Sequence, residues 1–173
     1  MNTRVVGWFR GYWASFILAL SVLLVGCSLP LVPPYDKAVI DALNVANTET
    51  MTLFASVDTG TKQYDYANRA ERYAQVIGKL DALIIAANAR PVPKNQASER
   101  LNNTLDQMLP ASANTAEIKI PSVYAMKKIS ETMTKMRDTD MKQGLTSYEV
   151  IAFKQQVSIY LDQAITYENF LQR

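Results

Sequence analysis

The stretch YDYANRAERYAQVIGKLDALIIAANA, residues 64–89, decides the fold class of this chain. Its apolar side chains recur at alternating steps of four and three residues, which places them on one face of an α-helix. The stripe consists of Tyr66, Ala70, Tyr73, Ile77, Leu80, Ile84 and Ala87. Arg90 and Pro91 end the pattern, because proline cannot continue a helix. The stretch therefore predicts a long amphipathic helix.

Other segments of the chain repeat this helical spacing. They are residues 36–57, a shorter stretch at residues 96–109, residues 122–143, and a last segment that begins at Thr146. Asp36 is expected to cap the N-terminus of the first helix. Gly144 is expected to end the helix at residues 122–143. Thr146 and Glu149 have the spacing of a capping box, in which each side chain accepts a hydrogen bond from the other residue's backbone.

These segments predict an all-α fold. Long helices of about 33–40 Å, joined by two short turns and a crossover at residues 91–121, are typical of an antiparallel bundle. We expect four long helices with the shorter helix packed across them, in a single domain at residues 35–173. The short turns make each flanking pair antiparallel, but the order in which the pairs pack stays open.

Three polar residues fall on or near the apolar seams of the predicted helices. Asn47 and Thr50 interrupt the seam of the first helix, and Asp140 falls near that of the helix at residues 122–143. A buried polar group without a partner lowers stability. These residues are therefore expected to bond one another inside the bundle, to lie at its frayed end, or to line a pocket.

Residues 1–26 have the layout of a secretory signal peptide. A leader containing Arg4 and Arg10 precedes the uncharged run FILALSVLLV at residues 16–25. A permanent membrane-spanning helix would need about 20 apolar residues. This run is shorter, and Pro30 prevents its extension. We expect the segment to be removed.

Leu24, Val25, Gly26 and Cys27 resemble the lipobox of bacterial lipoproteins. The resemblance implies cleavage between Gly26 and Cys27, a diacylglyceryl thioether on Cys27, and usually a further acyl chain on the new amino group. Two or more acyl chains give stable membrane anchoring, whereas one gives only marginal binding. The family's sorting rule implies an outer-membrane protein facing the periplasm, because Ser28 follows the cysteine where Asp would favour the inner membrane. Inner-membrane retention and surface display stay open.

Residues 27–34 are the lipidated cysteine and a proline-rich tether, which spans roughly 20 Å. Together with the lipobox, this tether, Tyr35 and Asp36 at the first helix, and Gly144 and Leu145 before the last helix resemble small helical lipoproteins of Gram-negative bacteria. Those proteins carry no assigned activity. The resemblance implies a helical bundle and an envelope location, and it transfers no functional residue.

The composition argues against several kinds of site. The chain has no histidine, and Cys27 is its single cysteine, so zinc-based and thiol-based catalysis and disulfides are excluded. Arg4 and Arg10 account for the excess of 18 basic over 16 acidic side chains. The mature chain is thus neutral and lacks the basic patch that nucleic acids require. We expect no enzyme, no cofactor, no metal and no nucleic-acid partner.

Residues 138–149 show a superficial similarity to a calcium-binding loop. Lys142 and Gln143 stand at the fifth and sixth positions, where such a loop needs an oxygen ligand and glycine. We interpret the segment as a helix end, a turn and a cap. The Asp and Glu side chains in general are expected on the solvent-facing sides of the helices.

Methionine and tyrosine side chains also follow the helical stripes. Met126, Met133 and Met136 share one face, and we expect them in the core rather than in a binding groove. Tyrosine suits half-buried core edges as well as contacts with a partner. The candidates are Tyr64, Tyr66, Tyr73, Tyr124, Tyr148, Tyr160 and Tyr167.

Two functions follow as hypotheses. The first is a non-enzymatic, membrane-anchored envelope lipoprotein that acts as a structural or protein-interaction module in the periplasm, with an envelope protein as its partner. The alternative is a carrier or sensor that binds an apolar small molecule or lipid between its helices.

Overall fold

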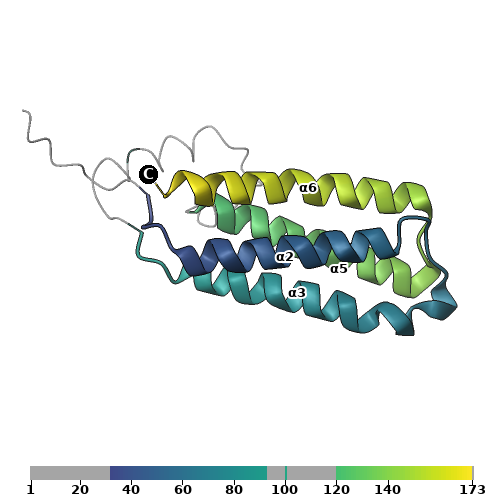
Figure 1. Cartoon of the computed structure of the whole chain (residues 1–173). Helices are drawn as coiled ribbons and strands as arrows, with labels where there is room; N and C mark the ends of the chain where they lie inside the picture. The colour runs from purple at the N-terminus through teal and green to yellow at the C-terminus, as the bar shows by residue number, and fades with distance from the viewer. Residues whose placement is uncertain (1–31, 93–99, 101–119, 173) are drawn as a thin grey trace, which may run out of the picture. The chain divides into compact units, whose positions relative to one another are not determined.

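The computed structural model describes residues 32–92, 100 and 120–172. The chain divides into two units, Met1–Pro30 and Leu31–Arg173, and every described residue belongs to the second. This unit is helical, without a strand in the described ranges. Its elements are α2 (Lys37–Ser56), the 3₁₀ turn η1 (Gln63–Asp65), α3 (Ala67–Asn88), α5 (Pro121–Gln143) and α6 (Ser147–Phe170) (Figure 1). Gly26, Cys27 and the helix predicted at residues 96–109 lie outside the described residues.

The four α-helices of the described ranges pack as an antiparallel bundle, which confirms the predicted all-α class. Each helix contacts two neighbours, because α2 packs against α3 and α6, and α5 packs against the same two helices. The packing order that the sequence left open is thus a ring in which chain neighbours are also spatial neighbours (Figure 1). We call the end with the turns at residues 57–66 and 144–146 the loop end. The opposite end, where α2 begins and α6 ends, is the tether end.

The apolar stripes of the helices meet in one core. Met126, Met133 and Met136 are fully buried, as predicted. The helical spacing of apolar residues in the last segment, which runs from Val150 to Phe170 and Leu171, predicts both of these last two side chains inward, but Phe170 is 55% exposed and Glu168 is buried in its place. The physical reason is that Arg90 and Ser122 bind the Glu168 carboxylate in the interior.

The predicted caps are confirmed. The Asp36 side chain accepts a hydrogen bond from the backbone N–H of Ala38 at 2.9 Å. Thr146 and Glu149 form the reciprocal capping box at the start of α6. The helix predicted from Tyr64 begins slightly later, at Ala67, because Asp65 N–H bonds to the carbonyl three residues before it and forms the tighter turn η1.

No helix in the described ranges is both long enough and apolar enough to cross a membrane.

Candidate functional site

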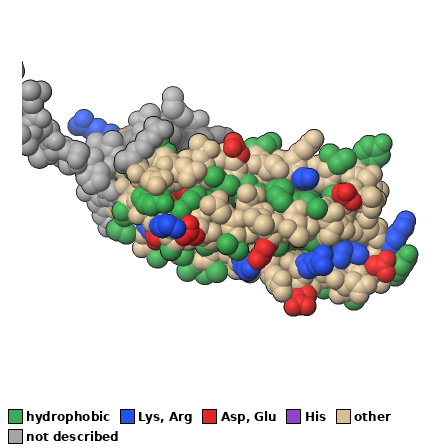
Figure 2. Space-filling view, viewed as in Figure 1, with side chains coloured by type: hydrophobic (Ala, Val, Ile, Leu, Met, Phe, Trp, Pro, Cys, Tyr) green, Lys and Arg blue, Asp and Glu red, His purple; other side chains and the backbone are tan. Residues whose placement is uncertain are grey.

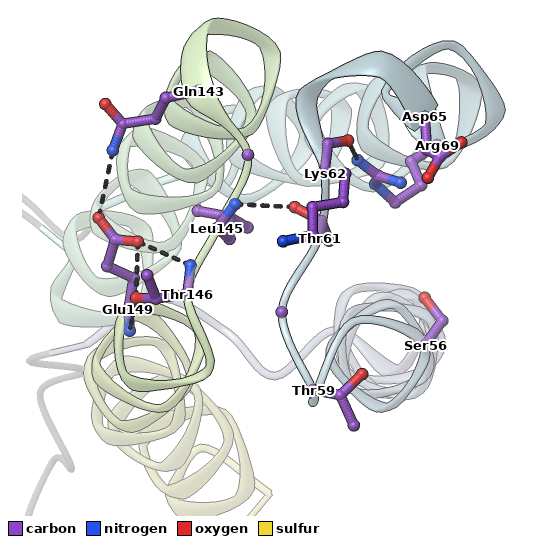
Figure 3. A pocket seen from close by; sticks show the side chains of 12 residues that line it. Ser56, Thr59, Thr61, Lys62, Asp65, Arg69, Gln143, Leu145, Thr146 and Glu149 are labelled. Carbon is purple, nitrogen blue, oxygen red and sulfur yellow. Dashed lines mark hydrogen bonds between the residues drawn. The ribbon is translucent and has the colours of Figure 1, made fainter.

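The loop end carries an open polar cleft of about 580 Å³. Its walls come from three places: the turn after α2, the first turns of η1 and α3, and the turn between α5 and α6 (Figure 3). Lys62, Asp65 and Arg69 lie on one wall, and Thr146 and Glu149 lie on the other. Both helical hairpins therefore contribute to a single site.

The two turns are tied directly to each other. The Thr61 N–H donates to the Leu145 carbonyl at 2.7 Å, and the Leu145 N–H donates to the Thr61 hydroxyl at 2.8 Å. Gly60 and Gly144 both have positive φ, at 92° and 80°. A Cβ on Gly60 would lie 2.6 Å from the Leu145 carbonyl oxygen, and one on Gly144 would lie 2.6 Å from the Thr61 carbonyl oxygen. Glycine is required at both positions, because only glycine permits this close approach.

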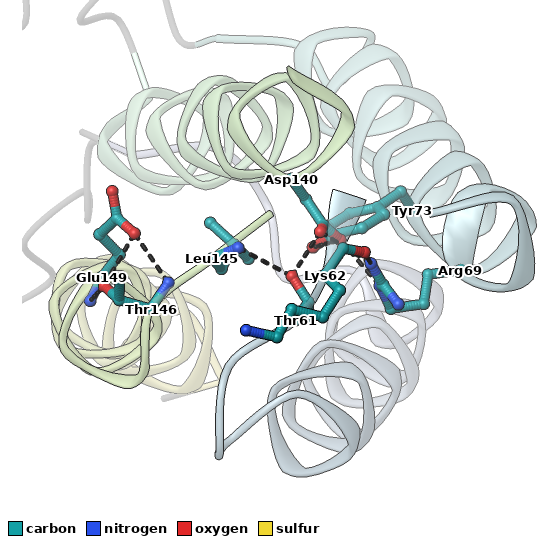
Figure 4. A network of polar contacts seen from close by, with 8 residues as sticks. All are labelled: Thr61, Lys62, Arg69, Tyr73, Asp140, Leu145, Thr146 and Glu149. Atoms are coloured by element: carbon teal, nitrogen blue, oxygen red, sulfur yellow. Dashed lines mark hydrogen bonds and ion pairs between the residues drawn. The ribbon is translucent and has the colours of Figure 1, made fainter. Parts of the chain in front are cut away.

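Below the turns, Asp140 is fully buried at the centre of a polar network (Figure 4). The Thr61 hydroxyl donates to its Oδ1 at 2.5 Å, and Tyr73 donates its phenolic hydrogen to Oδ2 at 3.2 Å. Arg69 binds both carboxylate oxygens, through Nε and Nη2, at 2.8 Å each. Nη2 also donates to the Lys62 carbonyl at 3.0 Å. The network thereby joins α5, α3 and the turn after α2.

The network determines the charge states of its members. Burial by itself would raise the pKa of Asp140, but the hydrogen bonds from Arg69 and Thr61 and the charge of Arg69 outweigh this and lower it. Burial, together with the neighbouring Asp140 charge, raises the pKa of the Tyr73 phenol. The Asp140 carboxylate is therefore ionised and Tyr73 is protonated at neutral pH. All of their buried polar atoms have hydrogen-bond partners.

The seam position predicted for Asp140 is confirmed, but its predicted bonding with Asn47 or Thr50 is not observed. The Thr50 hydroxyl donates to the Ala46 carbonyl at 2.7 Å within its own helix. The segment at residues 138–149 forms the end of α5, a turn and the cap of α6, as interpreted from the sequence. Among the described residues, no three carboxylate, cysteine or histidine side chains are grouped so that they could hold a metal ion.

A second buried carboxylate, at the tether end, contradicts the expectation that acidic side chains face solvent. Glu168 on α6 accepts two hydrogen bonds from Arg90, at 2.8 and 2.7 Å, and one from the Ser122 hydroxyl at 2.5 Å. The Arg90 side chain is 5% exposed and that of Glu168 is 0% exposed. A signal was present in the sequence, because Arg90 follows Ala87 by three and Glu168 follows Ala164 by four, which continues both apolar stripes.

The tyrosines divide into two groups. Tyr73 is buried and stacks on Tyr66, with ring centroids 6.3 Å apart. Tyr64 in η1 and Tyr148 in the first turn of α6 are 81% and 83% exposed. These two side chains belong to the two hairpins that form the cleft. Tyr73 and Tyr66 thus lie in the core or at its edge, whereas Tyr64 and Tyr148 are exposed at the loop end.

The loop end presents charged and aromatic side chains. Lys62 and Asp65 line the cleft and form no ion pair with any residue in the described ranges. Together with Tyr64 and Tyr148 they present charges of both signs beside exposed aromatic rings.

Comparisons with protein-family models, curated proteins and solved structures found no match to this chain.

Proposed function

We propose that this chain is a non-enzymatic envelope lipoprotein that is anchored through Cys27 and docks a protein partner with its loop end. In this proposal residues 1–26 are a cleaved signal peptide, residues 27–34 are the lipidated cysteine and tether, and residues 35–173 are the bundle with its shorter fifth helix. The protein is held at the bacterial outer membrane and faces the periplasm. Three acyl chains at Cys27 would make this attachment effectively permanent.

The observation that carries the proposal is the placement of Tyr64 and Tyr148. They are the most exposed large apolar side chains among the described residues, and each is next in the chain to a residue that lines the polar cleft, Asp65 or Glu149. Tyrosine is enriched at the energetic centres of protein interfaces, because its ring buries a large area while its hydroxyl remains hydrogen-bonded. The tether joins the opposite end of helices that are about 30–36 Å long, so the loop end is the part held farthest from the anchor.

A carrier function receives less support. The polar cleft at the loop end and a second cleft between α2 and α3 both open to solvent. The larger of the two, at the loop end, is lined by charged and polar groups. The apolar stripes fill the space between the helices with one another.

The test is crosslinking and affinity capture from native membranes, comparing the wild-type protein with the double variant Tyr64→Ala and Tyr148→Ala. We expect a stoichiometric envelope partner with the wild type and at least about a tenfold loss with the variant, as for hot-spot residues. The matched control is Ile159→Ala, which truncates another exposed apolar side chain in the middle of α6. Equal recovery from all three proteins would exclude the loop end as the docking site, and repeated recovery of a bare monomer would refute partner docking.

The anchor is tested separately by mass spectrometry of the native protein. We expect an amino terminus at Cys27 that carries acyl groups. An intact and unmodified residue 1–27 segment would contradict the lipoprotein assignment, whatever the capture experiment shows.

A further inference from the structure

The tether end of the bundle carries a second cleft, which we call the α2–α3 groove. It has a volume of about 490 Å³, and its floor and walls are almost entirely apolar. The lining side chains that matter are Ala38, Ala42, Val45, Ala82, Leu83 and Ala86. Val45 is 51% exposed, and Ile85 nearby on α3 is 71% exposed. An apolar surface of this kind, open to water, marks an interaction site.

The charged side chains on the α2–α3 hairpin differ between its two ends. The two lysines beside the groove are neutralised locally, because Lys37 pairs with Asp41 at 2.6 Å and Lys79 pairs with Glu49. Toward the loop end, α3 instead exposes Glu71 and Arg72. Figure 2 shows one face of the molecule, on which hydrophobic side chains lie among a few charged ones toward the tether end and further charged side chains lie toward the loop end.

The position of the tether indicates what covers the groove. Asp36, which lines one end of the groove, is nine residues from Cys27. Nine residues span at most about 32 Å when fully extended. If Cys27 carries acyl chains in a bilayer, the groove is always within reach of that bilayer.

We propose that the α2–α3 groove rests on the membrane surface and takes up acyl chains of its lipids, as a second contact beside the anchor. This inference rests on the lipidation of Cys27 proposed above. The apolar lining replaces water by hydrocarbon, and the paired charges at the edge stay at the level of the headgroups. The bundle then lies tilted, with its tether end on the bilayer and its charged loop end lifted into solution. This orientation leaves Tyr64 and Tyr148 free for a partner.

A second copy of the chain fits the groove less well. The apolar strip runs from Ala38 to Val45, which is about 10 Å along α2. A stable interface buries about 800 Å² on each partner, and a strip of this length is too short for it. Anionic ligands are also disfavoured, since both nearby lysines are paired with carboxylates and Asp36 adds a negative charge at the groove.

The experiment uses spin labels on the full, lipidated protein in vesicles of phosphatidylethanolamine and phosphatidylcholine. The thioether blocks Cys27, so an introduced cysteine is the single free thiol. Ala82→Cys places the label in the groove. Ala74→Cys, on the outer side of the same helix toward the loop end, and Ala152→Cys on α6 are matched controls, because all three alanines are exposed. Collision rates with oxygen and with a water-soluble nickel chelate are then measured.

We expect the ratio of oxygen to nickel collisions at Ala82→Cys to exceed that at both controls at least severalfold, and to stay unchanged when anionic lipid is added. Nickel access at Ala82→Cys equal to that at Ala74→Cys would overturn the inference. Shielding from both reagents would overturn it too, since a protein segment or a second copy would then fill the groove. Two free thiols in each cysteine variant would show that Cys27 is not lipidated, which refutes the anchor and this inference together, whereas one thiol with a water-exposed label refutes only the inference.

Discussion

Each end of the bundle contains one buried carboxylate, and the surroundings of the two carboxylates differ. Asp140 at the loop end and Glu168 at the tether end are both fully buried, and each binds an arginine and a hydroxyl group. The Arg69 side chain that binds Asp140 is 13% exposed and lines the polar cleft. The Arg90 side chain that binds Glu168 is 5% exposed.

The difference concerns what each network holds in place. Glu168 joins α6 to the start of α5 and to Arg90, two residues after the end of α3, so it holds helix ends together. Asp140 also holds Thr61, whose backbone and hydroxyl bind the Leu145 turn. The tether-end network thus secures the bundle, whereas the loop-end network also shapes the cleft and positions the turns beside Tyr64 and Tyr148.

The largest expected effect comes from breaking the tether-end pair. Arg90→Ala leaves the Glu168 carboxylate buried without its countercharge, which costs about 3–5 kcal/mol in the free energy of unfolding. Urea denaturation followed by circular dichroism measures this cost. The double variant Arg90→Met and Glu168→Leu removes both charges and is expected to recover much of the lost stability. A loss below about 1 kcal/mol in the single variant would show that water reaches Glu168.

Asp140→Asn is expected to cost less, about 2–3 kcal/mol, the range for hydrogen bonds to charged groups. Arg69 borders the cleft, so water can solvate it once the carboxylate charge is gone. The same denaturation experiment gives the comparison. Partner capture should also fall in Asp140→Asn but not in an Arg90 variant of equal stability. If both variants capture the partner equally, the two ends do not differ in the way described above.

The pH dependence sharpens this contrast. The folded-state pKa of Asp140 is lowered, so its contribution to stability is present above the unfolded-state pKa of about 3.9 and is lost as the pH falls through the folded-state value. The unfolding free energy of the wild type should therefore decrease below about pH 4. Asp140→Asn should flatten this decrease without abolishing it, because hydrogen bonds from Thr146 also lower the pKa of Glu149. If the unfolding free energies of the wild type and of Asp140→Asn decrease with the same slope as the pH falls, Asp140 is not ionised in the folded protein.

The smallest expected effects on stability come from alanine substitutions at two glycines, and their signs are opposite. Gly144→Ala places a Cβ at 2.6 Å from the Thr61 carbonyl oxygen at a φ of 80°, and should cost about 1–2 kcal/mol. Gly78→Ala is the matched control, since Gly78 lies inside α3 with nothing within 4 Å of the added Cβ. It should stabilise the protein by about 0.5–1 kcal/mol, because alanine favours a helix interior. Thermal unfolding of both variants checks the opposite signs. Equal shifts would mean that the turn at Gly144 adapts without strain.

The sequence alone was sufficient for the four α-helices of the described ranges, for most of their inward faces and for their caps. The stripe from Tyr66 to Ala87, the cap at Asp36 and the capping box of Thr146 and Glu149 are all in the structure. Each of these features depends on residues that are three or four positions apart, so the chain itself brings them together. The lipobox at Cys27 is local as well, and what it implies about lipidation stays a prediction.

Only the tertiary structure decided the ring order of the helices, the burial of Glu168 and the assembly of the cleft. Arg69 and Asp140 are separated by 71 positions, and Arg90 and Glu168 by 78. The spacing of residues along one helix says nothing about which charged side chain on another helix will face it. A seam position held by Glu or Arg is costly unless a partner arrives from elsewhere, and that partner exists only once the helices have packed.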